Sequence, residues 1–237
     1  IKYQKWLKNL YDANKVIKNT GNVFWHSWYV DHRTRLYPSC TELSPQGDDF
    51  SKAIIRFKKW KKVGNEGIKW IKIHLCNLFS GCHSGKNLSP LEKKSSQLSF
   101  EKRIEWVDKN IQNFKKIAKK PQNYLKELGF DDIYRSKNTA FQRLAVVIEF
   151  IRLIDKYDET KNWEEITSGL PVFLDASNNG FQHLAALSRN KDLAKHVNLL
   201  DTKNPKDLYL EISNLLKRTH KDRNTKLWEY LTQEKGL

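Results

Sequence analysis

The chain has 237 residues, of which 39% are hydrophobic and 12% aromatic, so it can fill the core of one or two domains and is not disordered. Its 43 Lys and Arg residues against 27 Asp and Glu residues give a formal net charge of +16, which favours nucleic acid or an anionic membrane surface as partner. No apolar run approaches the roughly 20 residues of a membrane-spanning helix, and no secretory signal is present, so we expect a soluble protein with no membrane partner.

The cysteines do not predict a disulfide framework or a zinc site. Cys40, Cys76 and Cys82 are odd in number and lack paired spacing, which favours reduced structural thiols. A zinc cluster that adds His74 and His83 is disfavoured, because His74 and Cys76 would point to different sides of a helix. The chain contains no Met, even at position 1, so we expect it to begin inside a longer open reading frame.

Residues 1–19 have apolar side chains at helical spacing with lysines between them, and Gly21 follows as a stop signal. We expect an amphipathic helix on the outer face of a globular protein, rather than a helix lying on a membrane. Residues 23–30 are aromatic and β-prone, which predicts a strand.

Two arginines follow the end of this strand. Arg33 and Arg35 beside Asp31 could clamp a phosphate, and the alternative is a surface ion pair. Further on, Pro45-Gln46-Gly47-Asp48 is typical of a turn. Residues 54–63 fit a strand and a helix equally well.

The middle of the chain predicts several helices. A helix begins at residues 64–67, and its buried face is formed by Ile68, Ile71, Leu75 and Leu78. Residues 80–99 read as a loop, after which Ser99 caps one long helix that ends at Pro121. Residues 139–154 form another apolar helix.

The most informative stretch is residues 170–189, LPVFLDASNNGFQHLAALSR. Its apolar start predicts a buried strand from Leu170 to Leu174 that delivers Asp175, followed by a helix. Asp175 alone could also be a simple turn former. A calcium loop is excluded, because its twelfth position should be Glu and is Ala186. Later, Asn204-Pro205 predicts the start of a last apolar helix.

The segment from Asp175 to Leu184, with Arg189 and residues 197–200 behind it, closely resembles motif A of the single-subunit, phage-type DNA-directed RNA polymerases. These enzymes serve phages, mitochondria, chloroplasts and organellar plasmids. The resemblance implies that Asp175 is one of two carboxylates that hold two Mg²⁺ ions, aided by the carbonyl of Ala176, where the family usually has Gly. It also implies supporting roles for Gln182, His183, Arg189 and Tyr209.

Other segments extend the resemblance from about residue 11 to about residue 216. Asp31 and Arg35 match the family's Asp-x-x-Gly-Arg motif, with Thr34 where the motif has Gly, and Arg33 finds an arginine in many members. Lys52 matches a lysine near nucleic acid. The resemblance therefore implies that Asp31, Arg33, Arg35 and Lys52 contact nucleic acid.

The implied fold is α+β and helix-dominated, a partial right-hand polymerase made of a palm with a helical insertion and the start of the fingers. Residues 1–20 would end the thumb, and 21–62 would form the first palm segment. Residues 63–167 would form the helical insertion, 168–190 palm motif A, and 191–237 the start of the fingers.

The implied function is template-dependent transfer of a ribonucleoside monophosphate to an RNA 3′-hydroxyl during transcription. The partners would be a DNA template, the RNA product and ribonucleoside triphosphates, with an accessory transcription factor allowed. The family's triphosphate-binding Lys and its second metal carboxylate would lie beyond Leu237, so we expect this chain alone to be inactive.

Two other function classes stay open at this point: a non-catalytic, basic nucleic-acid-binding module, such as a polymerase relic, and a membrane-surface protein. The Lys- and Asn-rich composition favours a mitochondrial or organellar-plasmid origin, and the cytoplasm of a phage-infected cell is the alternative.

Overall fold

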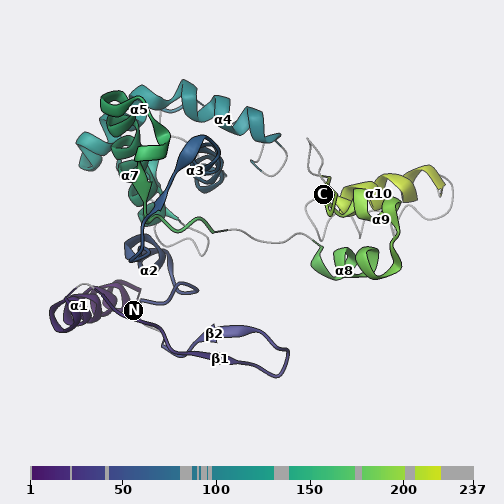
Figure 1. Ribbon diagram of the computed structural model, residues 1–237, viewed down its shortest axis with the longest axis horizontal. Coiled ribbons are helices and arrows are strands. Elements are labelled where there is room, and N and C mark those ends of the chain that lie inside the picture. Colours follow the sequence, from purple (N-terminus) through teal and green to yellow (C-terminus); the bar gives the residue numbers. More distant parts are fainter. Residues whose placement is uncertain are drawn as a thin grey trace. The chain divides into compact units, whose positions relative to one another are not determined.

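The computed structural model describes residues 2–21, 23–40, 43–80, 87–89, 91, 95, 98–130, 139–173, 178–200 and 206–219. The chain divides into two compact units, Ile1–Phe173 and Leu174–Leu237 (Figure 1). Helices dominate the described residues and their strands are short and antiparallel, which confirms a helix-dominated α+β fold. None of the helices in these ranges is long and apolar enough to cross a lipid bilayer.

The first unit begins with the predicted N-terminal helix, α1 (Lys2–Thr20). It stops at Gly21, whose φ of +59° lies in the left-handed region that favours glycine. The hairpin of β1 (Trp28–Val30) and β2 (Leu36–Pro38) follows, with Tyr29 opposite Tyr37. Only the last three residues of the predicted 23–30 strand are in β1.

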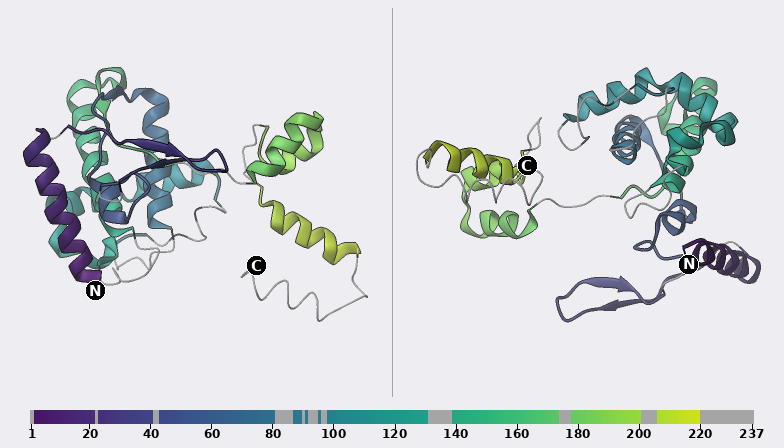
Figure 2. Two further views of the ribbon diagram at one scale, coloured as in Figure 1. Left: turned by 90° about the horizontal axis from the view of Figure 1, so that it is seen from below. Right: turned by 180° about the vertical axis from the view of Figure 1, so that it is seen from behind.

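The core of the first unit forms around α7 (Ala140–Thr160), which packs against α2 (Asp49–Ile54), α3 (Gly64–Phe79) and α5 (Ile111–Lys119). Figure 2 shows this helical group from two further sides. Its fully buried apolar side chains include Leu75, Val107, Phe114, Ile117, Leu128, Val147, Phe150 and Leu153. Each stabilises the fold by about 1.5–3 kcal/mol. The helical spacing predicted the burial of Leu75 but not that of Leu128 or Phe150.

The single long helix predicted between Ser99 and Pro121 is wrong. Ser99 caps α4 (Phe100–Lys109) through its hydroxyl, but Asn110 separates α4 from α5 with φ −102° and ψ 5°. The side chain of Asn110 is fully buried, donates to the carbonyl of Trp106 at 2.8 Å and accepts the amide of Ser89 at 3.0 Å. These bonds satisfy a buried polar group and thereby stabilise the break.

Two short elements, η2 (Pro121–Tyr124) and α6 (Leu125–Leu128), continue the chain after α5. The N terminus of α7 is then capped from α2, far away in the sequence. The carboxylate of Asp49 accepts the amides of Phe141 at 2.8 Å and Gln142 at 3.1 Å. This interaction satisfies amides that no helix can pair internally, and it ties α2 to the central helix.

A two-stranded ladder closes the first unit. β3 (Lys61–Lys62) pairs with β4 (Thr167–Ser168), which follows η4 (Trp163–Glu165). The strand predicted from Leu170 to Leu174 is wrong over residues 170–173, which lie in no strand. Leu170 instead packs against the helical core, so its apolar run reflects burial against helices rather than in a sheet.

The second unit contains α8 (Asn179–Ser188), α9 (Lys191–His196) and α10 (Leu208–Thr219), so the helix predicted after Asp175 is confirmed. Its small apolar core consists of Ala185, Ala194, Val197 and Leu208.

The cap of α10 differs from the prediction. Asp207 accepts the amides of Tyr209 at 3.0 Å and Leu210 at 3.2 Å, as an N-cap carboxylate does. The predicted Asn204-Pro205 start lies outside the described residues. Of the predicted apolar side, Leu208 is buried, whereas Ile212 is 44% exposed.

Candidate nucleic-acid interface

The turn between β1 and β2 brings together the three residues predicted to clamp phosphate. The carboxylate of Asp31 accepts the backbone amides of Arg33 at 2.8 Å and Arg35 at 2.9 Å, and the Nε of Arg33 at 3.2 Å. These bonds, led by the amide of Arg35, lower the pKa of Asp31. Asp31 therefore stays ionised and organises the turn, leaving both guanidinium groups on the surface.

Thr34 keeps the backbone conformation that a glycine would adopt at this position. Its φ is 60°, and its amide donates to the carbonyl of Asp31 at 2.9 Å. A left-handed conformation is unfavourable for a β-branched side chain, so the turn carries local strain. The departure from the Asp-x-x-Gly-Arg pattern therefore lowers the stability of this turn.

Thr34→Gly is expected to stabilise the hairpin by about 0.5–1 kcal/mol, because the relief of strain exceeds the extra flexibility that glycine brings to the unfolded chain. Amide hydrogen exchange of Asp31, whose amide bonds the carbonyl of Arg35, should slow about two- to fivefold. Thr34→Ala is the control, since it keeps the Cβ atom and should give no such gain. Equal protection in both variants would contradict the strain argument.

The hairpin presents arginines beside aromatic side chains. The Arg33 side chain is 55% exposed despite its bond to Asp31. Tyr29 and Tyr37 lie on one face of the hairpin with ring centroids 5.9 Å apart, and Trp28 on the other face is half-exposed. Exposed guanidinium groups of this kind bind phosphate, and exposed rings can contact sugars or bases.

Lys52 lies on α2, against the segment that leads toward Asp175. Its ammonium group lies 5.6 Å from the ring centroid of Phe173. His74 also approaches Phe173, with ring centroids 6.3 Å apart. Burial lowers the pKa of His74 to about 4, so its imidazole is neutral at physiological pH.

Asp48 and Asp49, which lie at the end of the predicted Pro45-Gln46-Gly47-Asp48 turn, both cap helices. Asp48 caps α2 by accepting the amide of Ser51 at 2.9 Å, and Asp49 caps α7. Both carboxylates are thus engaged by backbone amides, and neither resembles an open metal ligand.

An ionic network that was not predicted anchors residues 167–169. Glu149 of α7, 2% exposed, binds Arg56 at 2.7 Å and Arg152 at 2.7 Å, and accepts the hydroxyl of Ser168 at 2.6 Å. Burial alone would raise the pKa of Glu149, but hydrogen bonds from the two arginines and Ser168 outweigh it and lower the pKa to about 2. Arg152 also donates to the carbonyl of Thr167 at 2.8 Å.

Gly169 extends this anchor toward Asp175. Its carbonyl accepts the amide of Phe57 at 2.8 Å, and a Cβ atom at this position would lie 2.6 Å from Nε1 of Trp60. Only glycine permits this approach. Residues 167–169 are therefore fixed on two sides, by Glu149 and by the chain around Phe57.

The predicted metal ligands, Asp175 and Ala176, lie outside the described residues, so their geometry stays a prediction. Within the part of the chain that the structure describes, no group of three or more His, Cys, Asp or Glu side chains is placed to hold a metal ion.

The supporting residues predicted in the second unit have distinct positions. Gln182 of α8 donates to the carbonyl of Val197 at 2.7 Å and holds α8 against the end of α9. His183 and Tyr209 are exposed on α8 and α10. Arg189 ends α8 with a left-handed φ of 53°, and it is exposed. Gln182 thus has a packing role, whereas His183 and Arg189 present their side chains to solvent.

Comparison with known proteins identifies the family. Residues 61–235 match the family model described as DNA-dependent RNA polymerase. A probable DNA-directed RNA polymerase of Neurospora crassa is 31% identical over 192 residues, which cover 80% of this chain and 18% of that protein. DNA-directed RNA polymerase 1, mitochondrial, of Arabidopsis thaliana is 30% identical over 201 residues, covering 85% of this chain and 18% of that protein.

DNA-directed RNA polymerase 2, chloroplastic/mitochondrial, of Nicotiana sylvestris is 32% identical over 190 residues, which cover 80% of this chain and 16% of that protein. The chain therefore spans less than a fifth of the length of these relatives. The family match extends over most of the chain and includes the segment around Asp175. The chain belongs to the family of single-subunit, phage-type DNA-dependent RNA polymerases.

Proposed function

We propose that this chain is the part of a DNA-directed RNA polymerase that carries the first metal-binding carboxylate and part of the nucleic-acid contact surface. The whole enzyme would transfer ribonucleoside monophosphates from triphosphates to an RNA 3′-hydroxyl on a DNA template. The observation that carries this proposal is the family match over residues 61–235, which contains Asp175 within its motif A sequence.

The donor atoms around Asp175 suit magnesium. The carboxylate of Asp175 and the carbonyl of Ala176 are oxygen ligands, which Mg²⁺ prefers. When two such ions are bound, they lower the pKa of the 3′-hydroxyl and neutralise charge on the leaving pyrophosphate. Residues 167–169, which precede Asp175 in the sequence, are anchored by Glu149 and by the chain around Phe57.

Three cations have the complementary task of holding nucleic acid. Arg33 and Arg35 at the hairpin turn, and Lys52 beside Phe173, would bind phosphates of the template and the RNA–DNA hybrid. Asp31 would act by positioning the two arginines, because its oxygens are occupied within the turn. His183, Arg189 and Tyr209 would support the site from the second unit.

We assign the chain to three parts of a right-hand polymerase, with the ranges that the resemblance implies. These parts are the end of the thumb, the palm and the start of the fingers. The triphosphate-binding Lys and the second metal carboxylate of the family have no counterpart in this sequence, so the 237 residues alone should not polymerise RNA. Two of the named relatives are described as mitochondrial or chloroplastic/mitochondrial, which supports an organellar location, and we favour the mitochondrion.

The test is the salt dependence of binding to an RNA–DNA hybrid, followed by fluorescence anisotropy. The logarithm of affinity should fall linearly with the logarithm of salt concentration. Arg33→Ala, Arg35→Ala and Lys52→Ala should each weaken binding and reduce the slope by about one unit. The matched control is Lys109→Ala, an exposed lysine at the end of α4, which should change neither quantity. If the affinity does not depend on salt, or if all four variants lose the same affinity, these three residues do not form the interface.

A further inference from the structure

A second cationic surface lies between α2 and β3, away from the hairpin turn. Residues 56–62 are all exposed and read Arg-Phe-Lys-Lys-Trp-Lys-Lys, with no acidic residue among them. The family resemblance assigns no role to these side chains. We call residues 56–62 together with Trp25 the basic–aromatic surface.

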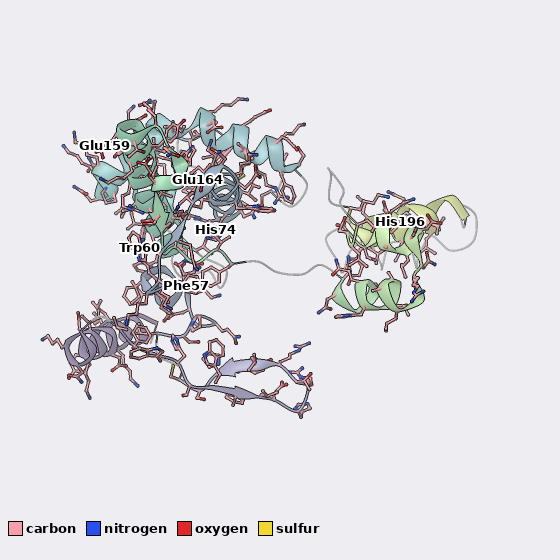
Figure 3. All side chains as sticks on the ribbon, viewed as in Figure 1. Phe57, Trp60, His74, Glu159, Glu164 and His196 are labelled. Carbon is pink, nitrogen blue, oxygen red and sulfur yellow. The ribbon has the colours of Figure 1, made fainter. Side chains whose placement is uncertain are left out.

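The aromatic side chains of this surface are unusually open to solvent. Trp25 is 80% exposed, Phe57 63% and Trp60 44%, whereas Phe114 and Phe150 in the helical core are fully buried. A group of exposed rings in one place is a feature of surfaces to which another molecule binds. Figure 3 labels Phe57 and Trp60 on the stretch that joins α2 to the helical core.

The cations of this surface divide into two groups. Arg56 is neutralised by Glu149. Among the described residues, Lys59, Lys61 and Lys62 make no ion pair, and Lys58 lies 5.4 Å above the ring of Trp25. The lysines therefore remain available to an anionic partner and lie next to the exposed rings.

The backbone under this surface is held in place. The amide of Phe57 bonds Gly169 at 2.8 Å, the amide of Val63 bonds Ile166 at 2.8 Å, and β3 pairs with β4 between them. Trp60 rests against Gly169, with Arg152 4.9 Å from its ring centroid. A surface fixed in this way loses little conformational entropy when it binds a ligand.

We propose that the basic–aromatic surface binds single-stranded nucleic acid. Lys58, Lys59 and Lys62 contact successive phosphates, while Trp25 and Phe57 stack on unpaired bases. Alternating cations and exposed rings are the general means of binding unpaired strands without sequence preference. This site goes beyond the proposed function, which places the RNA–DNA hybrid at the hairpin turn and at Lys52.

The chemistry favours this ligand over others. Bases in a duplex are already stacked, so their faces are closed to Trp25 and Phe57. The centres of protein interfaces are depleted in lysine, which disfavours a protein partner. An anionic membrane attracts lysines, but membrane-surface binding uses an amphipathic helix, and residues 56–62 belong to no helix.

The stacking contribution can be isolated with two probes of equal charge. The full 237-residue chain is titrated with a fluorescent fifteen-nucleotide oligothymidylate and with an abasic strand of the same length. The protein should bind the oligothymidylate about tenfold more tightly. The double variant Trp25→Leu with Phe57→Leu should reduce this preference below about threefold. Both positions are exposed, and thermal melting checks folding.

The charge contribution is tested by Lys59→Gln with Lys62→Gln. This pair should weaken oligothymidylate binding about tenfold at low salt. The matched control is Lys116→Gln with Lys119→Gln on α5, which are also exposed and remove the same charge. The control should lose less than about twofold. Equal losses in the two pairs, or an unchanged base preference in the aromatic variant, overturn the proposal.

Two further measurements distinguish this inference from the proposed function and from membrane binding. In one outcome, Arg35→Ala weakens binding of the RNA–DNA hybrid, but substitution of Lys59 or Phe57 does not weaken binding of the single strand. This outcome supports the proposed function and contradicts the binding role of the basic–aromatic surface. Vesicles of phosphatidylserine test the membrane alternative. If the Lys59 and Lys62 variant loses vesicle binding but keeps oligothymidylate binding, the surface binds lipid and the proposal is wrong.

Discussion

Asp175→Asn, introduced into the full-length polymerase to which we assign this chain, is expected to leave folding intact and to slow nucleotide addition at least about a thousandfold. The amide keeps the size of the side chain and can still accept hydrogen bonds in a turn. It cannot neutralise the charge of Mg²⁺ or help to acidify the 3′-hydroxyl. At about 1.36 kcal/mol per factor of ten, this loss corresponds to about 4 kcal/mol of transition-state stabilisation.

The measurement is single-turnover addition of one nucleotide to a preformed RNA–DNA hybrid, with thermal melting as the folding check. Asp192→Asn is the control, because Asp192 is an 88% exposed acid on α9 and should keep activity within about twofold. Hybrid affinity should survive in both variants, since the phosphate contacts are elsewhere. If Asp175→Asn extends RNA within tenfold of the parent at saturating Mg²⁺, Asp175 is a turn former only.

The second large effect concerns stability. Glu149→Gln should lower the free energy of unfolding by about 3 kcal/mol, because it leaves Arg56 and Arg152 without their shared, buried counter-ion. Urea denaturation followed by circular dichroism measures the change. Glu159→Gln on the same helix is the control (Figure 3). Glu159 is 65% exposed and pairs only with Lys156 among the described residues, so its loss should cost less than about 1 kcal/mol.

The pH dependence gives an independent signature of the same network. The pKa of Glu149 is about 2 in the folded protein, compared with 4.5 ordinarily. A depressed acid pKa contributes stability that is fully present above about pH 4.5 and is lost as the pH falls toward 2. The parent should therefore lose stability more steeply than Glu149→Gln across this window. Parallel curves would show that the carboxylate is not preferentially ionised by folding.

Sequence patterns predicted the helices well where one face is buried. The spacing of Ile68, Ile71 and Leu75 identified α3, because the residues on the buried face of a helix recur every three to four positions in the sequence. The break at Asn110 was not predictable, since it depends on a hydrogen bond to Ser89, which is distant in the sequence. The apolar run at Leu170 indicated burial correctly, but it could not distinguish a sheet from a helical core as the covering surface.

In the candidate site, too, features formed by sequence neighbours were predictable, and features formed by distant residues were not. The cluster of Asp31, Arg33 and Arg35 was predictable because its residues are neighbours in one turn. Glu149 was missed, because an acid in a helix ordinarily faces solvent, and its partners Arg56 and Ser168 come from other parts of the chain. The only available signal was its position among the apolar residues around Phe150, where a charge needs a partner. The metal role of Asp175 stays a prediction.

The ladder of β3 and β4, extended by the bond from Val63 to Ile166, has an evolutionary consequence. The chain leaves and returns at the same place, so the helices between these residues form a closed excursion. Longer or shorter versions of that excursion would leave the distance between Phe57 and Gly169 unchanged. Closing a longer loop costs only about 0.6 kcal/mol per doubling of its length. Related polymerases can therefore differ in length here without a change in the backbone bond between Phe57 and Gly169.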